Sequence, residues 1–140
     1  MAVFVACGAR PAPTPSPTVV FPHAEALRLR AEAFALARTE ARFEDTYAFT
    51  LPSFREACPY ENWFGGLIVE ARVTRAFAGL DDDEPLTWRV ELVEVDGQRG
   101  TVVESVLAFG SRGLAVEPRP WAFEDGEWWL DVPPKDICNL

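Results

Sequence analysis

The chain has few of the residues that carry metal chemistry or histidine-based catalysis. Its 140 residues include three cysteines and one histidine, His23, which precedes the first expected helix. A Ser-His-Asp set would therefore lack a histidine within the folded part of the chain. A structural zinc site requires four clustered ligands, so the sequence predicts no metal site. It also has no glycine-rich phosphate loop, and we expect no cofactor.

Positive charge and long apolar runs are also scarce, and this excludes further classes of partner. The formal net charge is −9, and no basic stripe is present that could bind the phosphates of a nucleic acid. No apolar run approaches the roughly 20 residues that span a bilayer. Attachment to a membrane would therefore require a lipid anchor.

The aromatic content indicates a packed core. The chain is 49% apolar and contains five tryptophans and ten phenylalanines, which is too apolar for a disordered protein. Residues 24–140 follow an N-terminal segment, residues 1–23, that is rich in proline. That length suits one domain around a single core, so we expect one domain over 24–140.

Cys7 stands between a short apolar segment and a proline-rich one. Val3–Ala6 precede it, and prolines follow at positions 11, 13, 15 and 17. This arrangement resembles the signal of a bacterial lipoprotein at its cleavage point. The resemblance implies that residues 1–6 are the remnant of a signal peptide and that Cys7 carries lipid. Residues 7–23 would then tether the domain outside the bacterial cell membrane.

The segment before Cys7 is short for such a signal. Secretory signals begin with positive charge and contain an apolar core of about 7 to 15 residues, whereas the six residues before Cys7 carry no charge. We therefore expect coding sequence for a basic, apolar leader upstream of Met1. The alternative interpretation is an unstructured N-terminus with an incidental cysteine.

The other two cysteines form an even pair if Cys7 is lipidated. A disulfide between Cys58 and Cys138 fits an extracytoplasmic location. It would close a loop of about 80 residues and contribute about 4 kcal/mol in the chain-entropy model. The alternative is two unpaired thiols, one of them buried as a small apolar residue.

The first half of the chain has helical patterns. Residues 24–49 are strong helix formers without glycine or proline, and they predict one long amphipathic helix. Pro52 begins a short second helix through Cys58, and Tyr60–Phe64 form a last helical turn that Gly65 and Gly66 close. The apolar face expected on the long helix consists of Leu29, Ala33, Leu36, Phe43 and Tyr47.

Alternating apolar residues in the second half predict an antiparallel meander. Asp81–Pro85 form an acidic loop, and Asp96-Gly97 and Asp125-Gly126 are hairpin signals. The fold class is therefore α+β, with helices followed by strands. The expected strands cover 66–74, 86–95, 101–109, a segment that ends near 124, and 128–132.

This order of elements, with the final hairpin Trp121–Leu130, resembles the nuclear transport factor 2-like superfamily over Ala24–Val132. The resemblance implies a long N-terminal helix and two short helices packed on a strongly curved antiparallel sheet. Together they would form a cone with a pocket at its mouth. The superfamily includes isomerases, dehydratases, hydrolases and members without activity, and many of its proteins pair through the sheet. It therefore implies a fold and a homodimer rather than one reaction.

Enzymes of this superfamily place a carboxylate, often with His or Tyr, deep in the cone. Glu40 shares the expected apolar face of the long helix, so it should point toward the sheet, and Glu40 with Tyr47 is the candidate catalytic pair. The alternative is that Glu40 pairs with an arginine at the edge of the core or faces water. Glu91 and Glu104 are expected on the outer, solvated face of the sheet, near Arg89.

Tryptophans are the candidate ligand contacts. Aromatic rings at a pocket mouth can stack on a sugar or an apolar ligand, and Trp63, Trp88 and Trp129 are the candidates for this role. Trp128 and Trp129 are adjacent in one strand, so they should face opposite sides of the sheet. Packing within the core is the alternative role for these rings.

Three functions remain open on the sequence. The first is a membrane-tethered, non-catalytic, extracytoplasmic domain that binds a small ligand or a protein partner. The second is a small acid–base enzyme of the isomerase, dehydratase or hydrolase type that uses Glu40 with Tyr47. The third is a dimeric structural or assembly accessory protein.

Overall fold

The computed structural model describes residues 8–15, 24–108, 111–115 and 118–138. Residues 8–15 belong to the expected tether; they contain no helix or strand and are exposed. Cys7 and His23 lie outside the described residues. In the part of the chain that is described, no helix is both long and apolar enough to cross a membrane.

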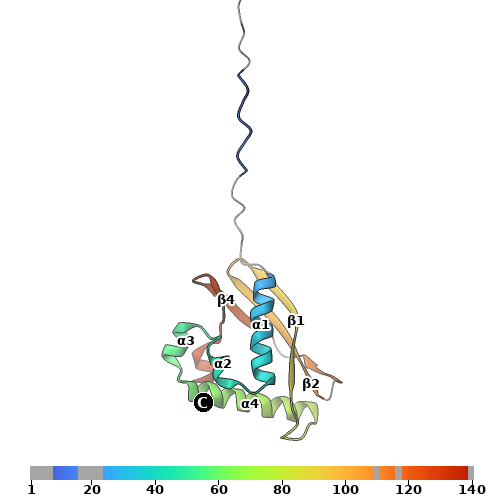
Figure 1. The fold of residues 1–140 in the computed structure, drawn as a ribbon. Helices are drawn as coiled ribbons and strands as arrows, with labels where there is room; N and C mark the ends of the chain where they lie inside the picture. The colour runs from blue at the N-terminus through green and yellow to red at the C-terminus, as the bar shows by residue number, and fades with distance from the viewer. Residues whose placement is uncertain (1–7, 16–23, 109–110, 116–117, 139–140) are drawn as a thin grey trace, which may run out of the picture.

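The described residues form helices and an antiparallel sheet, which is the α+β class predicted from the sequence (Figure 1). In chain order the elements are α1 (Ala24–Thr39), α2 (Phe43–Tyr47), α3 (Pro52–Ala57), α4 (Tyr60–Ala78), β1 (Thr87–Asp96), β2 (Arg99–Ala108), β3 (Ser111–Ala115), β4 (Arg119–Glu124), β5 (Glu127–Leu130) and α5 (Pro134–Ile137). The strands lie in the order β1-β2-β4-β5, and β3 pairs with β2. The sheet is not strongly curled, so the expectation of a strongly curved sheet is wrong.

Two turns of the sheet lie at the predicted hairpin signals. Gly97, at φ 58°, follows the end of β1 and precedes β2. Asp125 and Gly126 join β4 to β5 and have φ values of 51° and 80°. Positive φ at both central residues is the backbone of a type I′ turn, whose twist matches that of the paired strands. Both predicted hairpins are confirmed.

Helix α1 ends sooner than the sequence predicts. Ala41 has a φ of 56°, in the left-handed region that side chains disfavour. The amide of Ala41 donates to the carbonyl of Arg38 (3.1 Å), and the amide of Arg42 donates to the carbonyl of Ala37 (2.8 Å). These two hydrogen bonds form a Schellman motif that ends the helix. Two helices, α1 and α2, therefore replace the single helix expected over 24–49.

The buried face of α1 also differs from the expected one. Leu29 and Leu36 belong to the expected apolar face, but they are 63% and 51% exposed. The buried face lies on a different side of the helix from the predicted one. It includes the charged residue Arg38, which a prediction based on apolar residues alone does not select. The buried residues of α1 are Leu27, Ala31, Phe34, Ala35, Ala37 and Arg38.

Residues 66–74 are helical, so the first predicted strand is wrong. Helix α4 continues through Gly65 and Gly66 and is capped by Gly79, which has a left-handed φ of 68°. Its buried residues, Trp63 and Leu67, are four positions apart. The apolar segment fits both an alternating and a helical repeat, and contact with the rest of the molecule stabilises the helix.

Helix α1 packs on the inner face of the sheet. The rings of Phe34 on α1 and Trp121 on β4 meet edge to face with centroids 6.0 Å apart. Gly100 on β2 permits this close packing, because a Cβ atom there would collide with Leu27 and touch Trp128. The packing brings the C-terminal end of α1 close to α4 and to the start of β1 (Figure 1).

Candidate functional site

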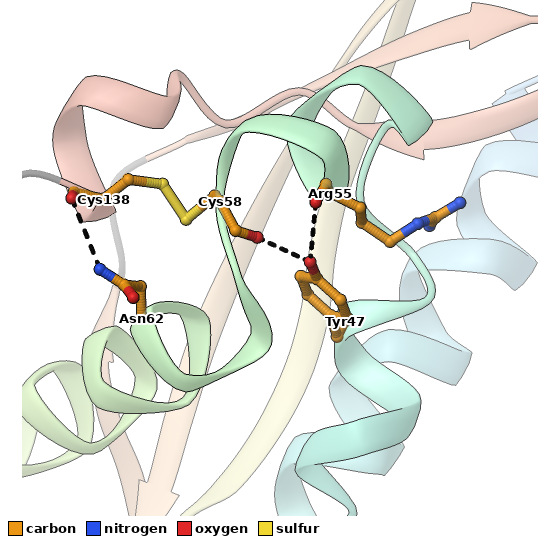
Figure 2. The surroundings of a disulfide bond; sticks show 5 residues. All are labelled: Tyr47, Arg55, Cys58, Asn62 and Cys138. Carbon is orange, nitrogen blue, oxygen red and sulfur yellow. Dashed lines mark hydrogen bonds between the residues drawn. A yellow bond between two sulfur atoms is a disulfide. The ribbon is translucent and has the colours of Figure 1, made fainter.

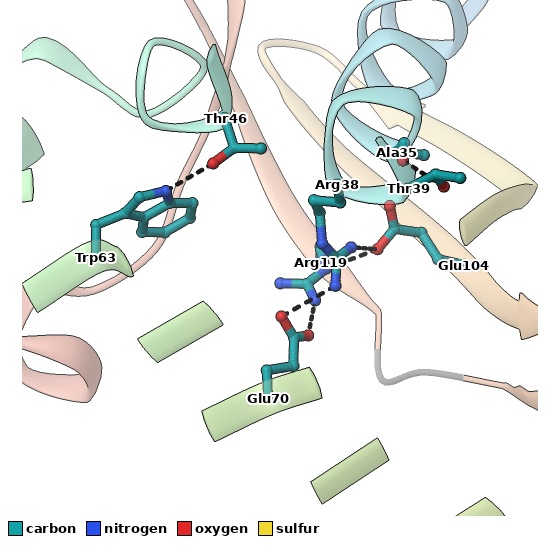
Figure 3. A network of polar contacts seen from close by, with 8 residues as sticks. All are labelled: Ala35, Arg38, Thr39, Thr46, Trp63, Glu70, Glu104 and Arg119. Carbon is teal, nitrogen blue, oxygen red and sulfur yellow. Dashed lines mark hydrogen bonds and ion pairs between the residues drawn. The ribbon is translucent and has the colours of Figure 1, made fainter. Parts of the chain in front are cut away.

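Four charged side chains from four different elements meet beneath the C-terminal end of α1 (Figure 3). Arg38 on α1 places Nη1 2.9 Å from Glu104 Oε2 and Nη2 2.9 Å from Glu70 Oε2. Arg119 on β4 donates from Nε to the same oxygen of Glu104 at 2.7 Å, and it also pairs with Glu70 on α4. We call Arg38, Glu70, Glu104 and Arg119 the charge network.

The charge network lies within the protein. The side chains of Arg38 and Glu104 are only 2% and 1% exposed. Those of Arg119 and Glu70 are 16% and 27% exposed. Two positive and two negative groups make the network formally neutral, which allows it to be buried, since an unpaired charge in this position would be strongly unfavourable.

Burial changes the acid–base behaviour of the two arginines. Loss of water around Arg38, together with the nearby charge of Arg119, lowers the pKa of Arg38 to about 10. Burial also acts to lower the pKa of Arg119, but attraction by Glu70 and Glu104 outweighs it and raises that pKa above its usual value. Both arginines therefore remain charged at neutral pH.

A cavity of about 210 Å³ borders the charge network. Arg38 and Glu70 form part of its wall, and Trp88 lies directly beside them, with the Arg38 guanidinium carbon 3.3 Å from the centroid of the indole ring. The exposed residues Ala41 and Pro85 lie at its rim. The other lining residues are Thr39, Phe43, Leu67, Ala71, Arg75 and Leu86.

One buried group beside the cavity lacks a hydrogen-bond acceptor. Arg38 Nη2 is close enough to Glu70 for an ion pair, but the contact does not have hydrogen-bond geometry. Among the described residues, no atom accepts a hydrogen bond from this buried nitrogen. A buried donor without an acceptor is unusual in a folded protein and indicates either strain or a missing partner.

Thr39 fixes the cavity wall by joining α1 to β1. Its hydroxyl donates to the carbonyl of Ala35 at 3.0 Å and accepts from the amide of Trp88 at 2.9 Å. Both bonds involve backbone groups, so they hold the end of the helix and the start of the strand in one arrangement. The ring of Trp88 is thereby positioned beneath Arg38.

Glu40 does not point toward the sheet, so its expected orientation is wrong. Its side chain is 49% exposed and accepts a hydrogen bond from Arg42 Nε at 2.7 Å. Glu40 follows the last residue of α1 and precedes the left-handed Ala41, and the turn there directs it away from the core. The alternative expected from the sequence was that Glu40 pairs with an arginine at the edge of the core or faces water; the side chain pairs with Arg42 and is half exposed to water.

Tyr47 contacts the backbone of α3 instead of the cavity (Figure 2). Its hydroxyl donates to the carbonyl of Cys58 at 2.6 Å and lies 3.2 Å from the carbonyl oxygen of Arg55. Neither Glu40 nor Tyr47 lines the cavity beside the charge network. The structure therefore does not bring the candidate catalytic pair together at that site.

Cys58 and Cys138 are joined in a disulfide, as the cysteine count predicts (Figure 2). Their Cα atoms are 5.5 Å apart, within the usual range. Cys58 follows α3, and Cys138 follows α5, where its carbonyl accepts a weak hydrogen bond of 3.4 Å from Asn62 on α4. The disulfide thus attaches the C-terminal helix to the helical half of the protein.

The three candidate tryptophans have three different surroundings. Trp63 is buried, and its Nε1 donates to Thr46 at 2.9 Å (Figure 3). Trp88 lines the cavity. Trp129 is half-buried, and its Nε1 donates to the carbonyl of Glu124. Trp128, its neighbour in β5, is buried, in agreement with opposite orientations of adjacent strand residues.

The outer face of the sheet carries several apolar side chains. Leu92, which is 48% exposed, is the register partner of the half-buried Val103. Trp129 on β5 is instead flanked by two arginines, because its ring centroid lies 5.4 Å from the guanidinium carbons of Arg30 on α1 and Arg55 on α3. The homodimer through the sheet that the sequence resemblance implies stays a prediction.

The charge network is the main feature of the site that the sequence did not predict. Glu104 was expected on the solvated face, but it is buried, because it alternates in register with the buried Val102 and Val106. The alternation of Glu104 with these two apolar residues is visible in the sequence. Glu91, in contrast, is exposed and accepts a hydrogen bond from Ser105. Within the described ranges, no group of three or more His, Cys, Asp or Glu side chains is placed to hold a metal ion.

Comparisons with protein-family models, with curated proteins and with solved structures gave no match. The case for a function therefore rests on the charge network and the cavity beside it.

Proposed function

We propose that this chain is a non-catalytic domain, tethered by lipid at Cys7 outside a bacterial cell membrane, that binds a small ligand in the cavity beside the charge network. The observation that carries the proposal is the cavity of about 210 Å³ between α1, α4 and the start of β1. An apolar cavity of about 150 Å³ is enough to bind benzene. A ring with one small substituent therefore fits the available space.

The carboxylate in the cavity wall supports binding rather than catalysis. Glu70 is the acidic residue that lines this cavity, and its two oxygens pair with Arg38 and Arg119. Both oxygens of this carboxylate are therefore engaged within the charge network, which gives Glu70 a structural role in the cavity wall. Glu40 and Tyr47 do not line this cavity, so the enzyme alternative lacks its candidate catalytic pair there.

The disulfide supports the proposed location. Disulfides persist in oxidising compartments outside the cytoplasm, and Cys58 and Cys138 are paired in this way. The sequence around Cys7 resembles a lipoprotein signal. We further propose that the domain is related to the nuclear transport factor 2-like superfamily, which the order of helices followed by antiparallel strands supports.

Filling the cavity tests the binding proposal. Ala71 lines the cavity from α4, so Ala71→Phe should occupy the space of the ligand. Ala76→Phe is the matched control, because Ala76 lies on an exposed part of the same helix. Benzyl alcohol, a neutral probe of suitable size, should raise the melting temperature of the wild type and of Ala76→Phe, since a ligand that binds the folded state stabilises it. It should have no effect on Ala71→Phe.

Equal responses of Ala71→Phe and Ala76→Phe would show that the probe binds elsewhere, and the absence of any response in the wild type would refute cavity binding. The tether requires a separate measurement. Mass spectrometry of the protein purified from membranes of its host should show a chain that begins at a lipid-modified Cys7. A cytosolic chain with an unmodified Cys7 would contradict the proposed location.

A further inference from the structure

The side chains of the cavity wall limit the chemical class of the ligand more closely than the cavity volume does. Apolar side chains form most of the wall, including Trp88, Leu67 and Leu86. Transfer of an apolar group from water onto such a surface is favourable in proportion to the area buried. The main part of the ligand is therefore expected to be apolar.

The polar part of the wall is predominantly positive. The charged residues that line the cavity are Arg38, Arg75 and Glu70, two cations and one anion. Glu70 is already paired with Arg38 and with Arg119. Arg75 uses Nε to donate to the carbonyl of Glu84 at 2.8 Å, which fixes its guanidinium at the wall without neutralising its charge. Because Arg38 and Glu70 belong to the formally neutral charge network, Arg75 is the lining charge that stands outside it, and it would repel a cationic ligand and attract an anionic one.

Arg38 also favours an additional negative charge. Burial and the charge of Arg119 together lower the pKa of Arg38 more than its two carboxylate partners raise it. Its Nη2 has no hydrogen-bond acceptor among the described residues. A negative group near this guanidinium would offset part of the desolvation of Arg38 and raise its pKa.

We infer that the cavity binds a small monocarboxylate that carries an aromatic ring or a short branched chain, with the carboxylate beside Arg75. This inference rests on the proposed function, because it names the ligand class of the same cavity. The apolar part of the ligand packs against Trp88 and Leu86. The protein as a whole has a net charge of −9, so any preference for an anion must come from these local residues.

Three probes of similar size and different charge test the inference: benzoate, benzyl alcohol and benzylamine. Titration calorimetry of the full chain should show that the wild type binds benzoate about tenfold or more tightly than benzyl alcohol, the difference expected for a charge-assisted contact. Benzylamine should bind most weakly. Arg75→Gln should lower the affinity for benzoate much more than the affinity for benzyl alcohol, and so remove most of the preference for benzoate.

Arg72→Gln is the matched control, because Arg72 is exposed on the same helix and does not line the cavity. It should retain the preference for benzoate. Equal affinity of the wild type for benzoate and benzyl alcohol would overturn the monocarboxylate inference and leave the proposed cavity binding intact. Equal loss of the preference in Arg72→Gln and Arg75→Gln would also overturn it, since the effect would then come from general surface charge. Failure of all three probes to bind the wild type would overturn both proposals.

Discussion

Glu104 holds two arginines with one oxygen, and its removal leaves both without their most buried partner. Arg38 Nη1 and Arg119 Nε lie 2.9 and 2.7 Å from Glu104 Oε2. Glu104→Gln keeps the shape of the side chain and removes its charge, so two buried cations would share Glu70 alone. We expect the free energy of unfolding in urea to fall by about 3–5 kcal/mol, the cost of breaking a buried ion pair.

Glu94→Gln provides the control for this measurement. Glu94 is exposed on β1, and a surface substitution of this kind changes the free energy of unfolding by about 0.5 kcal/mol or less. A loss in Glu104→Gln no larger than that of Glu94→Gln would mean that the charge network does not hold the buried arginines in place.

The residues of the charge network differ in how far the sequence predicts them. Glu104 has the same strand parity as Val102 and Val106, so its burial is implicit in a local pattern. Its partner on α1, Arg38, is part of a helical repeat that is otherwise apolar. The pairing of Arg119 with Glu70 is different, because these residues are 49 positions apart and meet only when α4 is helical. A single sequence carries no local signal for such a contact.

Among the elements, α4 tolerates a glycine pair in the middle of a long helix. Glycine costs about 0.5–1 kcal/mol relative to alanine within a helix. A Cβ atom at Gly65 would meet nothing within 4 Å, so Gly65→Ala should raise the free energy of unfolding by about 0.5–1 kcal/mol. Chemical denaturation monitored by circular dichroism measures this gain.

Gly66→Ala is the matched comparison on the same helix. A Cβ atom at this position would lie 3.2 Å from Ile137 Cγ2 on α5, which is closer than ordinary contact, so Ile137 would have to move. We expect Gly66→Ala to stabilise the protein less than Gly65→Ala. If Gly66→Ala stabilised the protein as much as Gly65→Ala, the close packing of α5 on α4 would be disproved.

The elements that the sequence predicts best are those whose signals are local. The hairpin at Asp125 and Gly126 depends on two residues that favour positive φ, and it forms as expected. Helix α4 was predicted as a turn and a strand because its glycine pair and β-branched residues favour those states locally. Its helical form depends on Trp63 and Leu67, which face the interior together, and on contacts that are distant in the sequence.

At the scale of the whole molecule, the cavity depends on segments that the chain brings together only after folding. Arg38 on α1, Ala71 on α4 and Trp88 on β1 line it together. The sequence predicts Trp88 as one of three candidate ligand contacts, and the resemblance implies a pocket, but neither places the two helices beside Trp88. The position of the cavity was therefore not predictable, because its walls are set by the angle at which the helices cross the sheet.

The disulfide is a covalent connection between the helical half of the domain and its C-terminal end. Cys58 is fully buried, and its bond to Cys138 spans 80 positions in the sequence. Cys138→Ala removes the bond and leaves Cys58 as a small buried residue, so the packing loss is limited. Under oxidising conditions we expect the variant to lose about 2–5 kcal/mol of unfolding free energy, because the unfolded chain gains the freedom that the cross-link removes.

Denaturation of both proteins in excess dithiothreitol is the control, since the reduced wild type should match the reduced variant. A variant that is equally stable under oxidising conditions would show that the C-terminal helix is held in place by its contacts with α4, such as that between Ile137 and Gly66, and not by the disulfide.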